Sequence, residues 1–290
     1  MPDFRNIPIV EIGPGSQASA AEDGLEYLAM PSGMQTYRAP LLPEPEDSEG
    51  LDQAHRLLAE VLAALADWQP GNRARRVDLD VLDSVNRRFV DQVLGEGEVS
   101  VAYEAAAPVR AQESVLAGVW RVQHRDQLGR VLRDTIEIGD VPELVRDATF
   151  VGADSRLDSA CDTDDPALQN APALLVELAD QLASWRTGDP VHSINLSLLP
   201  LSDADLALLG ERLGVGPVTI LSRGYGNCRI GSTAKRNAWW IKYYNSQDAL
   251  ILNTIEVCDV PAVAQAAAED IADSVERLDE ILSLYRRSDA

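Results

Sequence analysis

An internal repeat constrains the fold of this chain more than any other feature of its 290 residues. Trp120 and Trp239 lie 119 positions apart, and at that offset residues 94–145 align without a gap to residues 213–264. The two segments share 12 identities in 52 positions, whereas average residue usage gives about three. Because a repeat of this length corresponds to a whole structural unit, we expect two tandem copies of one fold.

The identical residues lie where helices end and begin. The glycines of Leu94-Gly-Glu-Gly97, which match Leu213-Gly-Val-Gly216, are typical of a helix C-terminus. Thr135-Ile-Glu137 and Asp140-Val-Pro142 match Thr254-Ile-Glu256 and Asp259-Val-Pro261 in the same way. We expect Asp140 and Asp259 to cap helices, with Glu143 completing a capping box in the first copy.

Hydrophobic spacing predicts the elements within each copy. In the first copy we expect a helix ending at Trp68, a strand, a helix and three strands, at residues 51–68, 77–82, 83–94, 99–103, 119–122 and 131–138. At an offset of 117 the helix ending at Trp68 pairs with one ending at Trp185. The predicted fold class is α+β, each unit having the order helix, strand, helix, three-stranded antiparallel meander, helix.

Composition divides the chain into four predicted segments. Residues 1–50 hold seven of the 16 prolines and form an extended Pro/Gly-rich N-terminal segment. Residues 51–150 form the first repeat, 151–165 a linker, and 166–290 the second repeat. The second repeat ends in a C-terminal helix that reaches Tyr285, with Ile271 and Leu278 on its apolar stripe.

The charge of the chain excludes some classes of partner. Lys and Arg total 25 against 47 Asp and Glu, which gives a formal net charge of −22. Such an acidic protein is not expected to bind nucleic acid or insert into a membrane, and no apolar run has the length of a membrane span. We expect a cytoplasmic protein, because the first residues lack the features of a secretory signal. The acidic surface either attracts a basic partner or serves solubility alone.

Side chains suited to catalysis or to metal binding are scarce. The three cysteines have no CxxC spacing and the three histidines are isolated, so we expect neither an enzyme nor a bound cofactor. Glu137 and Glu256 are the best candidates for acid–base chemistry, but a solvated strand face explains them better. Cys228 lies beside Arg229 in a glycine-rich stretch, where exposure would lower its pKa; an inert structural thiol is the alternative.

The most informative difference between the copies concerns one strand face. Where the first copy has arginines and a valine, the second has apolar side chains: Trp240, Tyr244, Leu250 and Leu252 replace Arg121, Arg125, Val131 and Arg133. Strict alternation places these four opposite Trp239, Ile241, Ile251 and Ile255. Leaving four such side chains in water would cost about 6 to 10 kcal/mol. We expect the C-terminal helix, the N-terminal segment, the other repeat or a partner protein to cover them.

The N-terminal segment adds further apolar side chains. Met30, Met34 and Tyr37 lie on a stretch with little predicted regular structure. Methionine and aromatic side chains are adaptable and are enriched at protein interfaces. They therefore dock on the body of the protein or bind a partner.

These motifs resemble those of one known family along nearly the whole chain. The resemblance rests on Gly13-Pro-Gly-Ser-Gln17, Met30-Pro-Ser-Gly-Met34, Leu94-Gly-Glu-Gly-Glu-Val99, Gly224-Tyr-Gly-Asn-Cys-Arg-Ile230, Tyr244-Asn-Ser-Gln-Asp248 and Leu250-Ile-Leu-Asn-Thr-Ile-Glu256. The chain thus resembles the hydrogenase expression/formation proteins named HupH or HyaF.

The resemblance implies an accessory chaperone in NiFe-hydrogenase maturation. Such a protein would bind the iron–sulfur small-subunit precursor before its twin-arginine export, although the large subunit and other hydrogenase accessory proteins are also candidate partners. The family motifs suggest Tyr225, Asn227, Cys228, Trp240 and Tyr244 as partner-binding residues. The alternative function is a metal or iron–sulfur carrier that uses Cys228.

Overall fold

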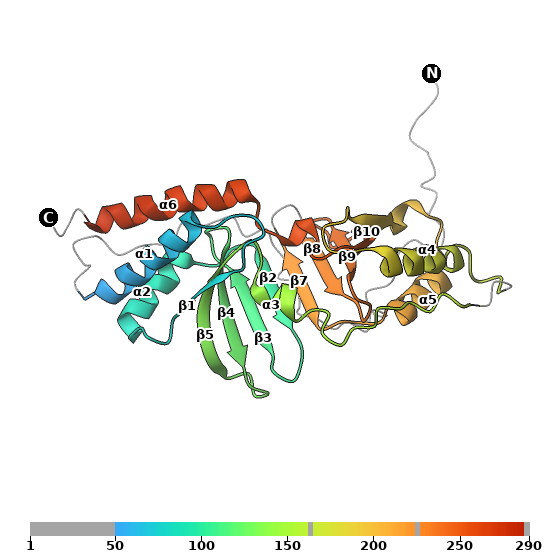
Figure 1. Cartoon of the computed structure of the whole chain (residues 1–290), viewed down its shortest axis with the longest axis horizontal. Helices are drawn as coiled ribbons and strands as arrows, with labels where there is room; N and C mark the ends of the chain where they lie inside the picture. The colour runs from blue at the N-terminus through green and yellow to red at the C-terminus, as the bar shows by residue number, and fades with distance from the viewer. Residues whose placement is uncertain (1–49, 162–164, 224–226, 287–290) are drawn as a thin grey trace, which may run out of the picture.

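A computed structural model describes residues 50–161, 165–223 and 227–286 of the chain. These residues form a ten-stranded antiparallel sheet with helices packed against it (Figure 1). The mixed α+β class predicted from the sequence is confirmed. The predicted N-terminal segment, with Met30, Met34 and Tyr37, lies outside the described residues.

The first half of the chain has the order helix, strand, helix, four strands, short helix. These elements are α1 (Asp52–Ala66), β1 (Arg75–Asp78), α2 (Ser84–Leu94), β2 (Val99–Tyr103), β3 (Val109–Glu113), β4 (Val119–Arg125), β5 (Val131–Ile138) and α3 (Glu143–Asp147). The predicted meander of three strands is wrong, because β3 makes a fourth. The predicted strand over 77–82 is also misplaced, since β1 ends at Asp78.

The second half repeats this order of elements. It contains α4 (Ala171–Ser184), β6 (His192–Asn195), α5 (Asp203–Leu213), β7 (Val218–Ser222), β8 (Asn227–Ser232), β9 (Ala238–Tyr244), β10 (Leu250–Val257) and α6 (Ala268–Arg286), with short 3-10 helices at Leu196–Leu198 and Ala262–Ala264. Here too the meander has four strands rather than three, because β8 forms at the glycine-rich stretch that contains Cys228.

One sheet runs through both halves. Its strand order is β1-β5-β4-β3-β2-β7-β8-β9-β10-β6, so β2 and β7 join the halves at its centre. Five paired positions, from Val99 opposite Ser222 to Tyr103 opposite Val218, make this junction. The strand that follows the first helix of each half, β1 or β6, lies at an outer edge.

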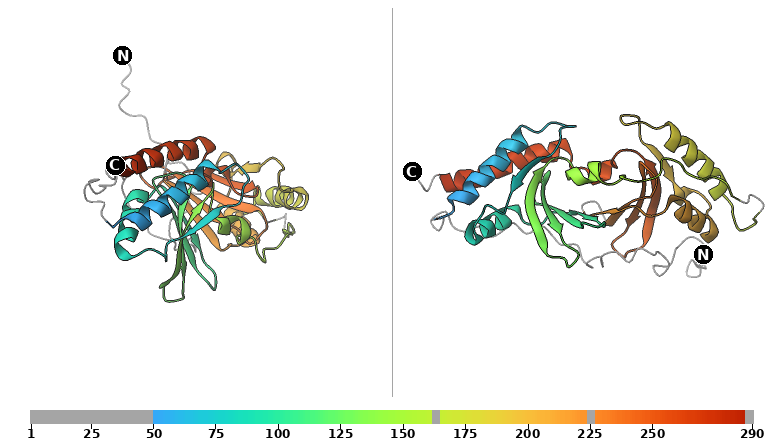
Figure 2. Two further views of the ribbon diagram at one scale, coloured as in Figure 1. Left: turned by 60° about the vertical axis from the view of Figure 1, so that its left-hand side comes forward. Right: turned by 60° about the horizontal axis from the view of Figure 1, so that its bottom comes forward.

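The C-terminal helix packs on the half from which it is distant in sequence. α6 lies against α1, and its side chains Ile271, Leu278 and Leu282 belong to the core of the first half. That core also contains the buried faces of α1 and α2 and one side of strands β1, β4 and β5. In Figure 2, α1, α2 and α6 lie over one end of the sheet and α4 and α5 over the other.

The segment that follows the first half packs against the second half. Phe150 contacts the ring of Trp239 edge to face, with 5.3 Å between ring centroids. Farther along, the backbone N–H of Asp154 donates to Ala234 O at 3.0 Å, and Leu157 is buried in the core of the second half. The core of the first half is therefore completed by α6, which follows the second half in sequence. The core of the second half is completed by the segment that joins the two halves.

Asp140 and Asp259 do not cap helices as expected, because Pro142 and Pro261 hold those positions. Asp83 caps α2, because its carboxylate accepts from the backbone N–H groups of Val85 and Asn86. Asp140 does not cap α3, which begins after Pro142. Its carboxylate instead binds Arg146 at 2.7 Å, and the side chain of Glu137 accepts from the N–H of Glu143 at 2.9 Å.

A candidate partner-binding surface

The predicted partner-binding residues of the second half lie on neighbouring strands. Asn227 and Cys228 begin β8, while Trp240 and Tyr244 lie on β9. Asn227 is paired directly with Tyr244, so these two side chains share a face. The predicted residue Tyr225 lies outside the described residues. Cys228 is paired with Tyr243 and points to the opposite side of the sheet.

A bulge changes the predicted faces of β10. The pairing with β9 shifts between Leu250 and Leu252, which leaves Ile251 out of the ladder. Leu252 therefore shares a face with Tyr243 rather than with Trp240. Strict alternation predicted that Ile255 and Trp240 lie on opposite faces of the sheet. This was wrong, because the two residues are directly paired and share a face. A β-bulge reverses the face of every residue beyond it.

Cations and aromatic rings alternate on the side of β8 and β9 that carries Trp240. We call Asn227, Arg229, Trp240, Lys242 and Tyr244 the β8–β9 surface. Arg229 Cζ lies 5.9 Å from the centre of the Tyr244 ring, and Lys242 Nζ lies 5.5 Å from that of Trp240. Both distances are typical of cation–π interactions. The five side chains are neither fully buried nor fully exposed.

Part of this surface is held by the second half itself. Trp240 Nε1 donates to Asn253 Oδ1 at 2.5 Å, and Asn227 Nδ2 donates to Asp248 Oδ1 at 3.4 Å. Gly210 of α5 faces the Trp240 ring, since a Cβ added there would lie 4.0 Å from it. The helix that covers Trp240 is thus α5. We had expected the C-terminal helix as one cover, but α6 packs on the first half.

The equivalent place in the first half is a closed ion-pair network. Arg121, which corresponds to Trp240, binds the buried Asp134 through Nη2 at 2.8 Å and Asp91 through Nη1 at 3.0 Å. Arg87 also binds Asp134, and Asp134 itself corresponds to Asn253. The charges of the first half satisfy one another. The second half has replaced one arginine and its aspartate by a tryptophan and an asparagine.

Cys228 is a buried thiol with a raised pKa. Its side chain is only 3% exposed, and burial raises its pKa to about 12 despite a hydrogen bond with Tyr243. Burial also raises the pKa of Cys258 to about 12. Both thiols are protonated at neutral pH, so a metal ion would have to displace their protons in order to bind. The described residues contain no group of three or more His, Cys, Asp or Glu side chains that could hold a metal ion.

Glu137 and Glu256 are not equivalent in their surroundings. Glu137 is buried and paired with Arg76 at 2.6 Å, so it does not lie on a solvated face as we expected. Glu256 is partly buried, and burial raises its pKa. Glu256 lies on β10 opposite Ser193 of β6, and Ser193 holds the position that Arg76 holds opposite Glu137 in the first half. Among the residues that the structure describes, neither carboxylate is paired with a second acid or base in an arrangement suited to catalysis.

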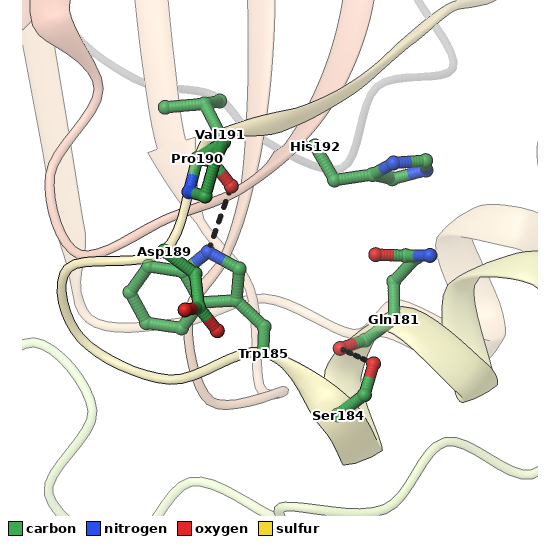
Figure 3. A pocket seen from close by; sticks show the side chains of 7 residues that line it. All are labelled: Gln181, Ser184, Trp185, Asp189, Pro190, Val191 and His192. Atoms are coloured by element: carbon green, nitrogen blue, oxygen red, sulfur yellow. Dashed lines mark hydrogen bonds between the residues drawn. The ribbon is translucent and has the colours of Figure 1, made fainter.

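Sequence reasoning missed two parts of this region. Arg229 and Lys242 are the charged members of the β8–β9 surface, and their alternation with Ile230 and Ile241 was the available signal. It also missed a pocket of about 370 Å³ beside β6, lined by Gln181, Ser184, Trp185, Asp189, Pro190, Val191 and His192 (Figure 3). The chain gives no local motif for it, because the pocket forms between the end of α4 and the loop that returns to the sheet.

Within the described ranges, no helix combines the length and the apolar character that a membrane span requires.

Comparison with known proteins identifies close relatives. The model of the family described as HupH hydrogenase expression protein, C-terminal conserved region, matches twice, at residues 51–159 and 168–285. The chain is 49% identical over 277 residues to the hydrogenase expression/formation protein HoxQ of Cupriavidus necator, covering 95% of this chain and 96% of that protein. It is 43% identical over 281 residues to HupH of Rhodobacter capsulatus, covering 97% and 98% of the two chains.

A more distant relative and a solved structure extend the comparison. The hydrogenase-1 operon protein HyaF of Escherichia coli is 33% identical over 277 residues, which are 93% of this chain and 94% of that one. The solved hydrogenase expression protein HupH from Thiobacillus denitrificans is 32% identical, covers 39% of this chain and 95% of its own, and has a TM-score of 0.36. The family match and the full-length relatives agree, and this chain belongs to the HupH/HyaF family of hydrogenase expression/formation proteins.

Proposed function

We propose that this protein is an accessory chaperone in NiFe-hydrogenase maturation. It binds a hydrogenase subunit precursor, and the iron–sulfur small subunit before twin-arginine export is the partner that the proposal names. Three relatives carry names that refer to hydrogenase expression or to a hydrogenase operon, which supports a role in hydrogenase maturation. The arrangement of side chains supports binding rather than catalysis.

The observation that carries the proposal is the contrast between equivalent places in the two halves. In the first half Arg121 and Asp134 form an ion pair. In the second half Trp240, Lys242 and Tyr244 form a partly exposed surface of rings and cations. Tryptophan, tyrosine and arginine are the side chains most enriched at binding hot spots. The second half thus carries the recognition surface.

The two halves are, in this proposal, copies of one unit that have diverged in use. The double match of the family model and the shared order of elements support it. So do equivalent polar positions: Asn86 accepts from Ala54 N at the start of α1, and Asp205 accepts from Ala171 N at the start of α4. The first copy stabilises the sheet, and the second binds the partner.

A competing function, transport of a metal or an iron–sulfur cluster by Cys228, gains no support from the site. A buried thiol with a pKa near 12 would have to be exposed and deprotonated before it bound metal. Protein purified without oxygen and then analysed for nickel, iron and sulfide tests this function directly. Stoichiometric metal that is lost in Cys228→Ser would favour the carrier.

The test of the chaperone is a binding assay between the full chain and the small-subunit precursor, with and without its signal peptide, over a range of salt concentrations. The expected result is binding that falls at least about tenfold, equivalent to 1.4 kcal/mol, in the Trp240→Ala/Tyr244→Ala double variant. Arg125→Ala is the matched control, because Arg125 holds the position of Tyr244 in the first half.

The outcome separates the parts of the proposal. Unchanged binding by a folded double variant would remove the β8–β9 surface as the recognition site. Binding that requires the signal peptide and weakens with salt would support a role before export, since screening reduces the attraction of an acidic protein for a basic segment. Binding of the large subunit alone would replace the named partner.

A further inference from the structure

The two edges of the sheet are equivalent strands with different protection. β1 and β6 occupy the outer edges, and at the offset of 117 Arg75 corresponds to His192 and Val77 to Ile194. The outer side of any edge strand presents backbone N–H and C=O groups that no neighbouring strand uses. Such an edge accepts another extended chain unless charges or other groups block it.

The β1 edge is flanked by charged side chains. Arg73 Nε lies 2.5 Å from Glu143 Oε1, and the backbone N–H of Ala74 donates to the other oxygen of Glu143 at 2.7 Å. Arg75 lies 3.6 Å from Asp67. β1 itself, Arg-Arg-Val-Asp, is mostly charged. An approaching strand would have to separate these ion pairs.

Among the described residues the β6 edge has less protection, because the contact between His192 and Glu177 at its first residue is the one charged pair of the strand. Its sequence, His-Ser-Ile-Asn, contains no Lys, Arg, Asp or Glu, and the side chain of Ser193 is exposed. Two large apolar side chains flank the strand: Val191 is 50% exposed and Leu198 is 79% exposed. Apolar side chains beside an open edge favour pairing with another chain.

The pocket opens at the first residue of β6. Figure 3 shows the Trp185 ring and the Asp189 carboxylate on one side of the hollow, with the His192 ring and the Gln181 side chain on the other. Trp185 Nε1 donates to Pro190 O at 3.2 Å, which fixes the ring against the loop. Asp189 Oδ2 accepts from the N–H of Arg186, so the carboxylate is held in place at the pocket wall.

The charges around the pocket favour a cation. Glu177 lies 2.9 Å from His192 Nε2, and the side chains of Asp180 and Asp189 are exposed. Arg186 is the one arginine or lysine on the described stretch from Glu177 to Asn195. The β8–β9 surface has the opposite character, because Arg229 and Lys242 are its charged members. A basic segment of a partner is therefore suited to the β6 edge and not to the β8–β9 surface.

We infer that the outer edge of β6 binds an extended, basic segment of the subunit precursor as an added β-strand. A Lys or Arg side chain of that segment enters the pocket beside Trp185 and Asp189, and apolar neighbours contact Val191 and Leu198. Backbone hydrogen bonds supply affinity and the pocket supplies specificity, as in other cases of strand addition. The inference rests on the proposed function for the identity of the partner.

The first experiment uses the full chain and short overlapping peptides that tile the precursor, with binding followed by fluorescence anisotropy. Peptides that combine β-branched residues with one Lys or Arg are expected to bind. Ser193→Arg, which gives β6 the residue found at the equivalent position of β1, should weaken them at least about tenfold. Ala63→Arg adds the same charge on an exposed position of α1 and should have no effect.

Asp189→Asn keeps an oxygen that can accept from Arg186 N but removes the charge. This variant should bind peptides that contain Lys or Arg more weakly than the original chain does. Its binding of the Lys→norleucine analogues should be unchanged. Equal binding of both peptide types by Asp189→Asn and the original chain would overturn the role of the pocket. Equal binding by Ser193→Arg and Ala63→Arg would overturn strand addition at β6.

A photo-crosslinking amino acid at Leu198 then identifies the occupant in the complex. Capture of a basic precursor segment supports the inference. Capture of a second copy of this chain, or of residues 1–49 of the same chain, would overturn it. The two proposals remain separable: precursor that binds Ser193→Arg normally refutes the β6 site alone, whereas precursor that binds no form of the protein refutes the proposed function.

Discussion

Glu113 is a buried carboxyl group whose ionisation is costly to the fold. It is 8% exposed on β3, where burial raises its pKa to about 7, against one hydrogen bond from Gly118 N, and the nearby Glu98 and Asp270 raise it further. Below about pH 4.5 both folded and unfolded chains hold this proton. As pH rises from 4.5 to 7 the unfolded chain loses it first, so the free energy of unfolding falls.

Glu113→Gln should remove this decrease in the free energy of unfolding with rising pH. We expect the variant to be more stable than the original chain at pH 8, by up to about 3 kcal/mol, and to differ little at pH 4.5. Urea unfolding at both pH values measures the difference. Glu60→Gln removes one exposed charge from α1 and serves as the control. A stabilisation that is the same at the two pH values would contradict the assignment to Glu113.

Asp205 has the opposite behaviour, because its charge is satisfied. Burial opposes ionisation, but hydrogen bonds from Ser202, Ala171 and Gln169 lower its pKa below 3.8. The stability that it contributes is present above that value and is lost as pH falls through the lowered pKa. Asp205→Ala leaves the buried N–H of Ala171 and the partly buried N–H groups of Gln169 and Ser202 without this acceptor.

We expect Asp205→Ala to lower the free energy of unfolding by about 3 kcal/mol at pH 7. Asp203→Ala, on an exposed residue of the same helical turn, should cost far less. Chemical denaturation of both variants at pH 7 measures the two changes. Equal destabilisation would show that the helix start, and not the buried carboxylate, determines the result.

At this scale the sequence singled out residues for the proposed site. It singled out Trp240 and Tyr244 because they differ from Arg121 and Arg125 at equivalent positions. It could not give the burial of Cys228, since its proximity to Arg229 in sequence says nothing about which side of a strand each occupies until the strand is recognised. Two partners of Asp205, Gln169 and Ala171, lie 36 and 34 positions from it in sequence and are set by tertiary packing.

At the scale of elements, the structure explains why two glycines are identical between the copies, in the segments that join α2 to β2 and α5 to β7. A Cβ at Gly97 would lie 2.2 Å from Ser114 O, and one at Gly216 would lie 2.4 Å from Ser232 Oγ. Each glycine also donates its N–H to the neighbouring strand, Gly97 to Glu113 O and Gly216 to Ser232 O. Only glycine permits this close approach of two backbones.

Gly97→Ala is therefore expected to destabilise the protein by at least about 2 kcal/mol, because backbone must move to admit the methyl group. Gly210→Ala on α5 is the matched control. Its Cβ would lie 4.0 Å from the nearest atom, and alanine favours the helix, so stability should be unchanged or higher by up to about 1 kcal/mol. Thermal unfolding of the two variants tests the contrast. A neutral Gly97→Ala would mean that the strand start is free to shift.

Amphipathic helices and alternating strands were predicted where their pattern was regular. α1, α2, β2 and β5 were found close to their expected positions. β3 and β8 were missed because β3 follows a run of alanines and β8 follows glycines, both of which lower strand propensity. Their place in the sheet comes from pairing with β2 and β4 or with β7 and β9. The bulge in β10 likewise depends on pairing and not on composition.

At the scale of the molecule, the sequence predicted two repeats but not how they combine. A repeat suggests separate units, yet β2 pairs with β7 across the centre of the sheet. The stripe of α6 was recognised, but its target was not, because an apolar stripe specifies no particular partner surface. The result is that α6 closes the core of the first half, and the segment with Phe150 and Leu157 packs on the second.

This exchange predicts that the two halves unfold together. Leu278 of α6 is fully buried against α1, although it follows the second half in sequence. Leu278→Ala should lower the free energy of unfolding by about 2 to 5 kcal/mol. Because the sheet is continuous, amide hydrogen exchange should accelerate equally in β4 of the first half and β9 of the second. If β9 amides kept their protection while β4 amides lost theirs, the halves would be independent units, and the ladder between β2 and β7 would add little to their coupling.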